Sequence, residues 1–130
     1  MAESYLIIGG SSDIALHLVE QLCEAGHHVT VLARDESRVS SLQDSGVSVV
    51  VGDGLVESDV LAAIDVAKQR GDGGITGAAH LIGSILLKPP HALKLEDFES
   101  VIRTNLTSAF LSLSLTVSYT HLRAHETDSY

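Results

Sequence analysis

The amino-acid sequence predicts an α/β fold, a doubly wound parallel sheet with helices on both faces, and three observations support this prediction. Short runs of Val, Ile, Leu and Ala alternate along the chain with longer segments in which apolar residues recur at helical spacing. The connections between these segments are short and rich in Gly, Ser and Asp. The first apolar run leads through a Gly/Ser turn directly into an amphipathic segment. Chains that alternate strands and helices in this way form parallel sheets with right-handed crossovers.

The individual elements follow from these patterns. The first strand covers residues 5–8, and the helix after it begins near Ser12, a good N-cap, and stops at Gly26. Ile14 is the first of the apolar positions assigned to this helix. The further elements are a strand at 28–32, a short helix at 37–44, a strand at 47–51, a helix at 57–69, a strand at 78–82 and a long helix at 95–113. The sequence thus predicts about four strands with flanking helices.

The composition is that of one small soluble domain. With 130 residues the chain can form a single core, and a formal net charge of −9 without a Lys/Arg cluster argues against non-specific binding of nucleic acid. No apolar segment approaches the roughly 20 residues of a membrane span, and no signal peptide is apparent, so we expect a cytoplasmic protein without a membrane segment. The single cysteine, Cys23, excludes an internal disulfide. No metal-ligand spacing surrounds His80, which we expect to be a packed, hydrogen-bonded histidine.

The turn at residues 9–12 has the features of a phosphate-binding site. A strand that ends in a tight turn and opens a helix leaves backbone N–H groups unpaired at the helix N-terminus, where the helix dipole also favours an anion. We therefore expect Gly9, Ser11, Ser12 and Ile14 to line the pyrophosphate of a dinucleotide.

Two charged residues lie where such a dinucleotide would place its adenosine half. Arg34 ends the second strand, about 20 residues beyond the turn, where an acidic residue would bind the ribose of NAD and an arginine would pair with the additional phosphate of NADP. The alternative is an arginine that only faces solvent. Asp53 and Gly54 follow the third strand, where the carboxylate could accept a hydrogen bond from the adenine amino group or simply form a turn. The sequence favours NADP over NAD.

At this point the sequence resembles the short-chain dehydrogenase/reductase family. Residues 8–15, Ile-Gly-Gly-Ser-Ser-Asp-Ile-Ala, stand where the family has Thr-Gly-x-x-x-Gly-x-Gly, and only the first glycine is kept. Asp53 matches the family's aspartate after the third strand, and Gly83 matches the glycine of its Asn-Asn-Ala-Gly segment, here His-Leu-Ile-Gly. Residues 99–110 resemble the family's next helix, with Asn105 in the place of a catalytic residue that holds a water in a proton relay. The resemblance covers residues 5 to about 113 and implies a Rossmann-like fold and a hydride-transfer enzyme that acts on a carbonyl or alcohol.

The same resemblance implies that this chain is catalytically incomplete. The family's serine and its Tyr-x-x-x-Lys pair have no counterpart here, since Tyr119 is followed four residues later by Arg123. Residues 117–130 resemble the translation of a sequencing adapter, and we interpret them as a non-native tail behind a partial NAD(P)-binding domain at 1–116. The leading hypothesis is the cofactor-binding part of an NADP-preferring enzyme that takes a small-molecule substrate and whose full-length form could be a homo-oligomer. The alternative is a non-enzymatic module that binds and senses the dinucleotide.

Overall fold

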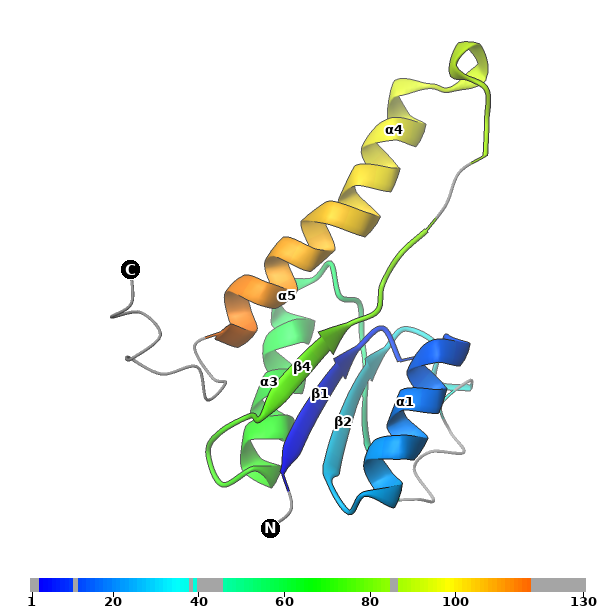
Figure 1. Ribbon diagram of the computed structural model, residues 1–130. Coiled ribbons are helices and arrows are strands. Elements are labelled where there is room, and N and C mark those ends of the chain that lie inside the picture. Colours follow the sequence, from blue (N-terminus) through cyan, green and yellow to red (C-terminus); the bar gives the residue numbers. More distant parts are fainter. Residues whose placement is uncertain (1–2, 11, 38, 40–45, 85–86, 118–130) are drawn as a thin grey trace, which may run out of the picture.

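The computed structural model describes residues 3–10, 12–37, 39, 46–84 and 87–117 of the chain. Its centre is a four-stranded parallel sheet in the order β3-β2-β1-β4 (Figure 1). The strands are β1 (Ser4–Ile8), β2 (His28–Ala33), β3 (Ser48–Val51) and β4 (Gly77–His80). The predicted helix at 37–44 and the tail at 117–130 lie almost entirely outside the described residues.

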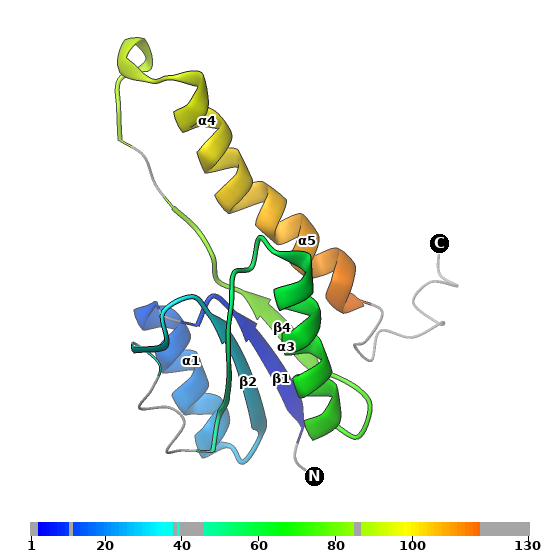
Figure 2. The ribbon, with the colours of Figure 1, turned by 180° about the vertical axis from the view of Figure 1, so that it is seen from behind.

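Helices cover both faces of this sheet, as the sequence predicts. Helix α1 (Asp13–Glu24) lies on one face and α3 (Glu57–Arg70) on the other (Figures 1 and 2). Because successive strand residues point to opposite faces, β1 contributes Ile7 to the α1 side and Leu6 and Ile8 to the α3 side. The result is a Rossmann-like, doubly wound arrangement with two aliphatic core layers.

Side-chain hydrogen bonds hold the N-terminus of α1 and the C-terminus of α3 in place. Ser12 caps α1, because its side chain accepts a hydrogen bond from Ala15 N at 3.2 Å. At the end of α3 the Arg70 guanidinium donates to Val29 O at 2.7 Å, to Ser48 Oγ at 2.9 Å and to Gly46 O at 3.0 Å. Arg70 thereby joins α3 to β2 and to the start of β3.

The long helix at residues 95–116 differs from the prediction of one regular helix. It consists of α4 (Leu95–Ile102), a π-helical segment η2 (Arg103–Thr107) and α5 (Ser108–Thr116), and a 3₁₀ turn η1 (Pro90–Ala92) precedes it. Within η2, Asn105 Nδ2 donates to Val101 O at 2.9 Å, and Ser108 Oγ donates to Thr104 O. Side chains that bond carbonyls of their own helix compete with the regular i→i−4 pattern, and both of these bonds occur where the turn is wider.

The long helix extends beyond the sheet and leaves apolar side chains exposed (Figure 1). Phe98, Leu106 and Phe110 are 52%, 63% and 68% exposed. In α1, Ile14 is 74% exposed, so its assignment to the apolar side of that helix is wrong. Among the residues that the structure describes, none of the helices combines the length and the apolar character needed to cross a membrane.

Candidate functional site

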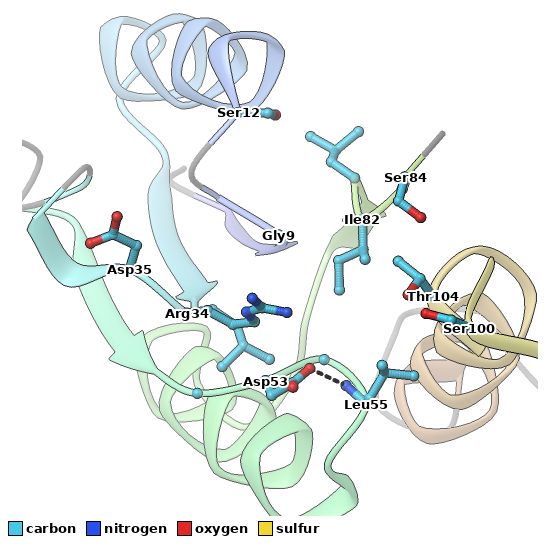
Figure 3. A pocket seen from close by; sticks show the side chains of 15 residues that line it. Gly9, Ser12, Arg34, Asp35, Asp53, Leu55, Ile82, Ser84, Ser100 and Thr104 are labelled. Atoms are coloured by element: carbon cyan, nitrogen blue, oxygen red, sulfur yellow. Dashed lines mark hydrogen bonds between the residues drawn. The ribbon is translucent and has the colours of Figure 1, made fainter. Parts of the chain in front are cut away.

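A cleft of about 710 Å³ opens at the carboxyl ends of the strands (Figure 3). Parallel sheets bind ligands at this edge because the strand ends, the following loops and the helix N-termini meet there. Its walls come from the loops after all four strands and from one side of the long helix. The lining residues are Gly9, Ser12, Leu32, Arg34, Asp35, Gly52, Asp53, Gly54, Leu55, Leu81, Ile82, Gly83, Ser84, Ser100 and Thr104.

The glycine turn after β1 contributes its shape. Gly9 has a positive φ of +92°, which side chains rarely tolerate, and a Cβ there would lie 2.7 Å from Ile82 Cγ1. The N–H groups of Gly9 and Gly10 both donate to Leu32 O, at 2.9 and 3.2 Å. These two amides are therefore used inside the protein, and the phosphate-binding donors expected from the sequence would have to come from the start of α1.

The remaining residues predicted for the pyrophosphate are distributed unevenly. Ser12 lines the cleft at the N-terminus of α1. Ile14, two residues further along the chain, is exposed to solvent and does not line the cleft. Ser11 lies outside the described residues.

The residues after β2 and β3 form the opposite wall. Figure 3 shows the Arg34 guanidinium directed toward the middle of the cleft, with Asp35 at its edge. Asp35 Oδ1 accepts from Ser37 N at 3.0 Å and from Ser37 Oγ at 2.6 Å. Asp53 is held in a turn, because its Oδ1 accepts from Leu55 N at 2.9 Å and its own N–H donates to Asp59 Oδ2 at 2.9 Å. The structure thus brings Arg34, Asp53 and Gly54 to one cleft.

Asn105 joins the long helix to the loop after β4. Its Oδ1 accepts from Ser84 N at 2.9 Å, and its Nδ2 donates to Ser84 O at 3.0 Å. Gly83 permits this close approach, because a Cβ there would lie 3.1 Å from Asn105 Oδ1. Asn105 does not itself line the cleft, whereas Ser84 and Thr104 beside it do.

His80, at the end of β4, is hydrogen-bonded as the sequence analysis expects. Its Nε2 lies 2.9 Å from Ser108 Oγ. Because that hydroxyl donates its own proton to Thr104 O, it accepts from His80, and Nε2 carries the ring proton. Burial disfavours the charged ring and lowers the pKa of His80 below its ordinary value. The described part of the chain contains no group of three His, Cys, Asp or Glu side chains that could hold a metal ion.

Several lining residues were not predicted from the sequence. Leu55 and Ile82 supply apolar surface, and Ser100 and Thr104 supply hydroxyl groups one helical turn apart. The positions of Leu55 and Ile82 just after strand ends carried a signal, because the carboxyl edge of a parallel sheet is where ligands bind. No sequence pattern marks Ser100 and Thr104 as lining residues, since their place at the cleft depends on the direction of the long helix.

Comparison with known proteins agrees with this geometry. Residues 9–69 match a family model described as NAD(P)H-binding. Two curated proteins of Arabidopsis thaliana match over 111 residues: Senescence-associated protein 13 with 31% identity and a tropinone reductase homolog with 28% identity. The matched part is 81% of this chain but only 41% and 42% of those proteins, so the chain spans about two fifths of their length.

Solved structures show the same fold. A short-chain type dehydrogenase/reductase from Mycobacterium ulcerans superimposes with a TM-score of 0.81 at 18% identity, over 92% of this chain and 48% of that one. An NADPH-bound carbonyl reductase from chicken fatty liver gives 0.79 at 20% identity, over 91% and 51%. The fold is Rossmann-like, and the part of it at residues 9–69 matches the NAD(P)H-binding model. The chain is similar to short-chain dehydrogenase/reductase structures in fold, and it covers about half of the length of those chains.

Proposed function

We propose that this chain binds NADP(H) in the cleft, as the cofactor-binding part of a short-chain dehydrogenase/reductase that transfers hydride between NADP and a carbonyl or alcohol. The observation that carries the proposal is Arg34. It follows β2 directly and directs its guanidinium into the cleft beside Asp53. A guanidinium at this strand end pairs with the 2′-phosphate that distinguishes NADP from NAD.

The other walls assign the rest of the cofactor. With the 2′-phosphate at Arg34, the base lies against Gly54 and Leu55 and can present its amino group to Asp53. The pyrophosphate then lies at the start of α1, near Ser12, where the helix dipole favours it. The nicotinamide half extends toward Ser84 and the long helix. Asn105, which bonds to Ser84 there, would belong to the proton relay that the family resemblance implies.

Calorimetric titration of the chain with NADPH and NADH tests the cofactor. We expect tighter binding of NADPH, and Arg34→Leu should weaken it by at least about tenfold while changing NADH binding little, because a charge-assisted phosphate contact is worth roughly 1.5–3 kcal/mol. Arg103→Leu is the matched control, since Arg103 lies on the long helix and does not line the cleft. Equal affinities for the two dinucleotides, or an Arg34→Leu variant that loses both equally, would contradict the NADP preference.

A turnover assay separates the enzyme from the dinucleotide-sensing alternative. The chain itself, which lacks a Tyr-x-x-x-Lys pair, should not oxidise NADPH with small carbonyl substrates. The full-length protein should do so if it is a reductase, whereas a sensor would bind NADPH without turnover. We further propose that the full-length enzyme is cytoplasmic, takes a small-molecule substrate and assembles as a homo-oligomer. Measurable turnover by this chain alone would show that it is not catalytically incomplete.

A further inference from the structure

Helix α3 begins at a residue that cannot cap it with a side chain. The N-cap residue is Val56, which makes no side-chain cap hydrogen bond, and its own N–H donates to Asp53 O at 2.9 Å. The first turn carries two acids, Glu57 and Asp59, where the helix dipole favours negative charge. In a capping box the acid at the third helical position accepts from the N-cap N–H. Asp59 occupies this third position, but its carboxylate bonds outside the helix, to Asp53 N.

The bond from Asp59 reaches the turn that follows β3. Its Oδ2 accepts from Asp53 N at 2.9 Å. The same turn is joined to β2, because Gly52 N donates to Ala33 O at 2.9 Å, and it is closed on itself, because Leu55 N donates to Asp53 Oδ1 at 2.9 Å. Asp59 thus adds a link between this turn and α3.

The link is short and comes from a well-packed element. A Cβ added to Gly52 would lie 2.8 Å from Asp59 Cβ and 2.9 Å from its Oδ2, so Asp59 approaches the turn where position 52 has no side chain. The residue after Asp59, Val60, has no exposed surface and belongs to the core layer on the α3 side. The Asp59 carboxylate therefore holds the turn from a helix whose position is fixed by the core.

The Asp53 side chain is the part of this turn that can meet a ligand. Asp53 lines the cleft and Asp59 does not (Figure 3). Because Asp53 Oδ1 already accepts from Leu55 N, Oδ2 is the oxygen that can accept from a ligand. Such a bond requires short range and good alignment, so a shift of the Asp53 backbone would weaken it.

We propose that Asp59 is a positioning residue for recognition of the cofactor's base: through the Asp53 N–H it fixes the orientation in which the Asp53 carboxylate accepts from the adenine amino group. The inference rests on the proposed function, and it adds a residue that does not touch the cofactor. Asp59 therefore contributes to the preference for adenine over a base that lacks the amino group.

The test is calorimetric titration of the chain with NADPH and with its hypoxanthine analogue, in which an oxygen replaces the adenine amino group. The unchanged chain should bind NADPH at least about fivefold more tightly, the equivalent of one hydrogen bond. Asp59→Ala removes the acceptor for Asp53 N–H and should abolish this preference, while its affinity for the analogue changes by less than about twofold. Asp59→Asn keeps a side-chain oxygen for the same N–H and should keep the preference.

Two further variants separate positioning from general effects on the cleft. Asp65→Ala removes an exposed carboxylate from the same helix, outside the cleft lining, and should leave both affinities unchanged. In an Asp53→Ala background, Asp59→Ala should not change the preference further, because the residue through which it acts is gone. If Asp59→Ala does not fold, Asp59→Ser replaces it: serine suits the start of a helix, but its hydroxyl is too short to reach Asp53 N–H, so the same loss is expected.

The other outcomes separate failure of this inference from failure of the proposed function. If the unchanged chain prefers NADPH and Asp59→Ala keeps that preference, or loses NADPH and the analogue equally, Asp59 does not position Asp53 and the proposed function stands. If the unchanged chain binds NADPH and the analogue equally, Asp53 does not bind the amino group, and its assignment fails together with the inference. If the unchanged chain binds neither, the proposed function itself is wrong.

Discussion

The sheet body, meaning the four strands with α1 and α3, and the long helix at residues 95–116 bury opposite kinds of side chain. In the sheet body most buried residues are aliphatic, with Ser4 and Thr30 as buried hydroxyl residues among them, and Leu6 and Val19 have no exposed surface. In α5 the fully buried residues are Ser108, Ser112 and Thr116, while Phe110 and Leu113 are exposed and only Leu111 and Leu115 pack in part against the core layer on the α3 side. Within the described residues, α4 has no buried residue at all.

The part of the cleft formed by the sheet body and the part formed by the long helix are therefore stabilised by different interactions. Burial of aliphatic surface stabilises the sheet body, which holds Gly9, Arg34 and Asp53 in place. The long helix approaches β4 through small hydroxyl residues that mostly bond to carbonyls of their own helix, as Thr116 Oγ1 does to Ser112 O at 2.7 Å. Its position beside the cleft therefore depends on a few polar contacts and on Leu111 and Leu115, which pack against the core layer on the α3 side.

The largest difference in stability should appear when one leucine of the sheet body and one leucine of the long helix are each replaced by alanine. Leu6→Ala, in the middle of β1, should lower the free energy of unfolding by about 3 kcal/mol, because it removes buried surface and leaves a cavity. Leu106→Ala removes the same atoms from an exposed position and should cost less than about 0.5 kcal/mol. Urea unfolding followed by circular dichroism measures both values. Similar losses of unfolding free energy in the two variants would show that Leu106 contributes as much to stability as Leu6, and the contrast between the two regions would be wrong.

Arg70 tests the sheet body at its polar end. Arg70→Met keeps most of the side-chain volume but removes the donors to Val29 O and Gly46 O, and it should cost about 1–3 kcal/mol as those carbonyls lose their partners. Arg103→Met, on the exposed long helix, should change the free energy of unfolding by less than about 0.5 kcal/mol. The same urea experiment applies. The interpretation of Arg70 as a joint between α3 and β2 is wrong if the two substitutions cost the same.

The sheet body is also the part that the sequence predicts well. The alternation of strands and helices, the parallel sheet and the Ser12 cap all follow from local patterns, and the structure confirms them. Arg34 and Asp53 were placed at the cleft by the same logic, because the carboxyl ends of parallel strands share one edge.

What the sequence does not predict depends on pairs of residues far apart in the chain. At the π-helical segment, Asn105 and Ser108 bond carbonyls of their own helix, and each also contacts β4 or the loop after it. The place of Ile82 in the cleft lining requires that Gly54 has no side chain, since a Cβ there would lie 2.2 Å from Ile82 Cδ1, and no local pattern reveals this.

Asn105 offers a measurement at the junction of the two regions. Asn105→Ala removes the acceptor for Ser84 N–H, and exchange of that amide with deuterium should become about fivefold faster, since one hydrogen bond contributes about 1 kcal/mol. Asn105→Asp retains a side-chain oxygen for the same N–H and should preserve much of the protection. NMR-detected exchange of the Ser84 amide distinguishes the three proteins. Unchanged exchange in Asn105→Ala would mean that other contacts hold the long helix to the loop after β4.

The smallest effect should be the pH dependence that His80 adds at the same junction. Burial lowers the pKa of His80, so below its ordinary value of about 6.5 the unfolded chain binds a proton more readily than the folded one. The contribution of His80 to stability should therefore be present above that pH and decline as the pH falls toward the folded-state pKa. His80→Gln can still donate to Ser108 Oγ but does not titrate. The difference in unfolding free energy between the unchanged chain and His80→Gln should be constant from pH 8 to about 7 and then shift against the unchanged chain toward pH 5.5, as urea unfolding at each pH would show. A difference independent of pH would mean that His80 keeps the same protonation behaviour in both states, and that water reaches its ring where the long helix meets β4.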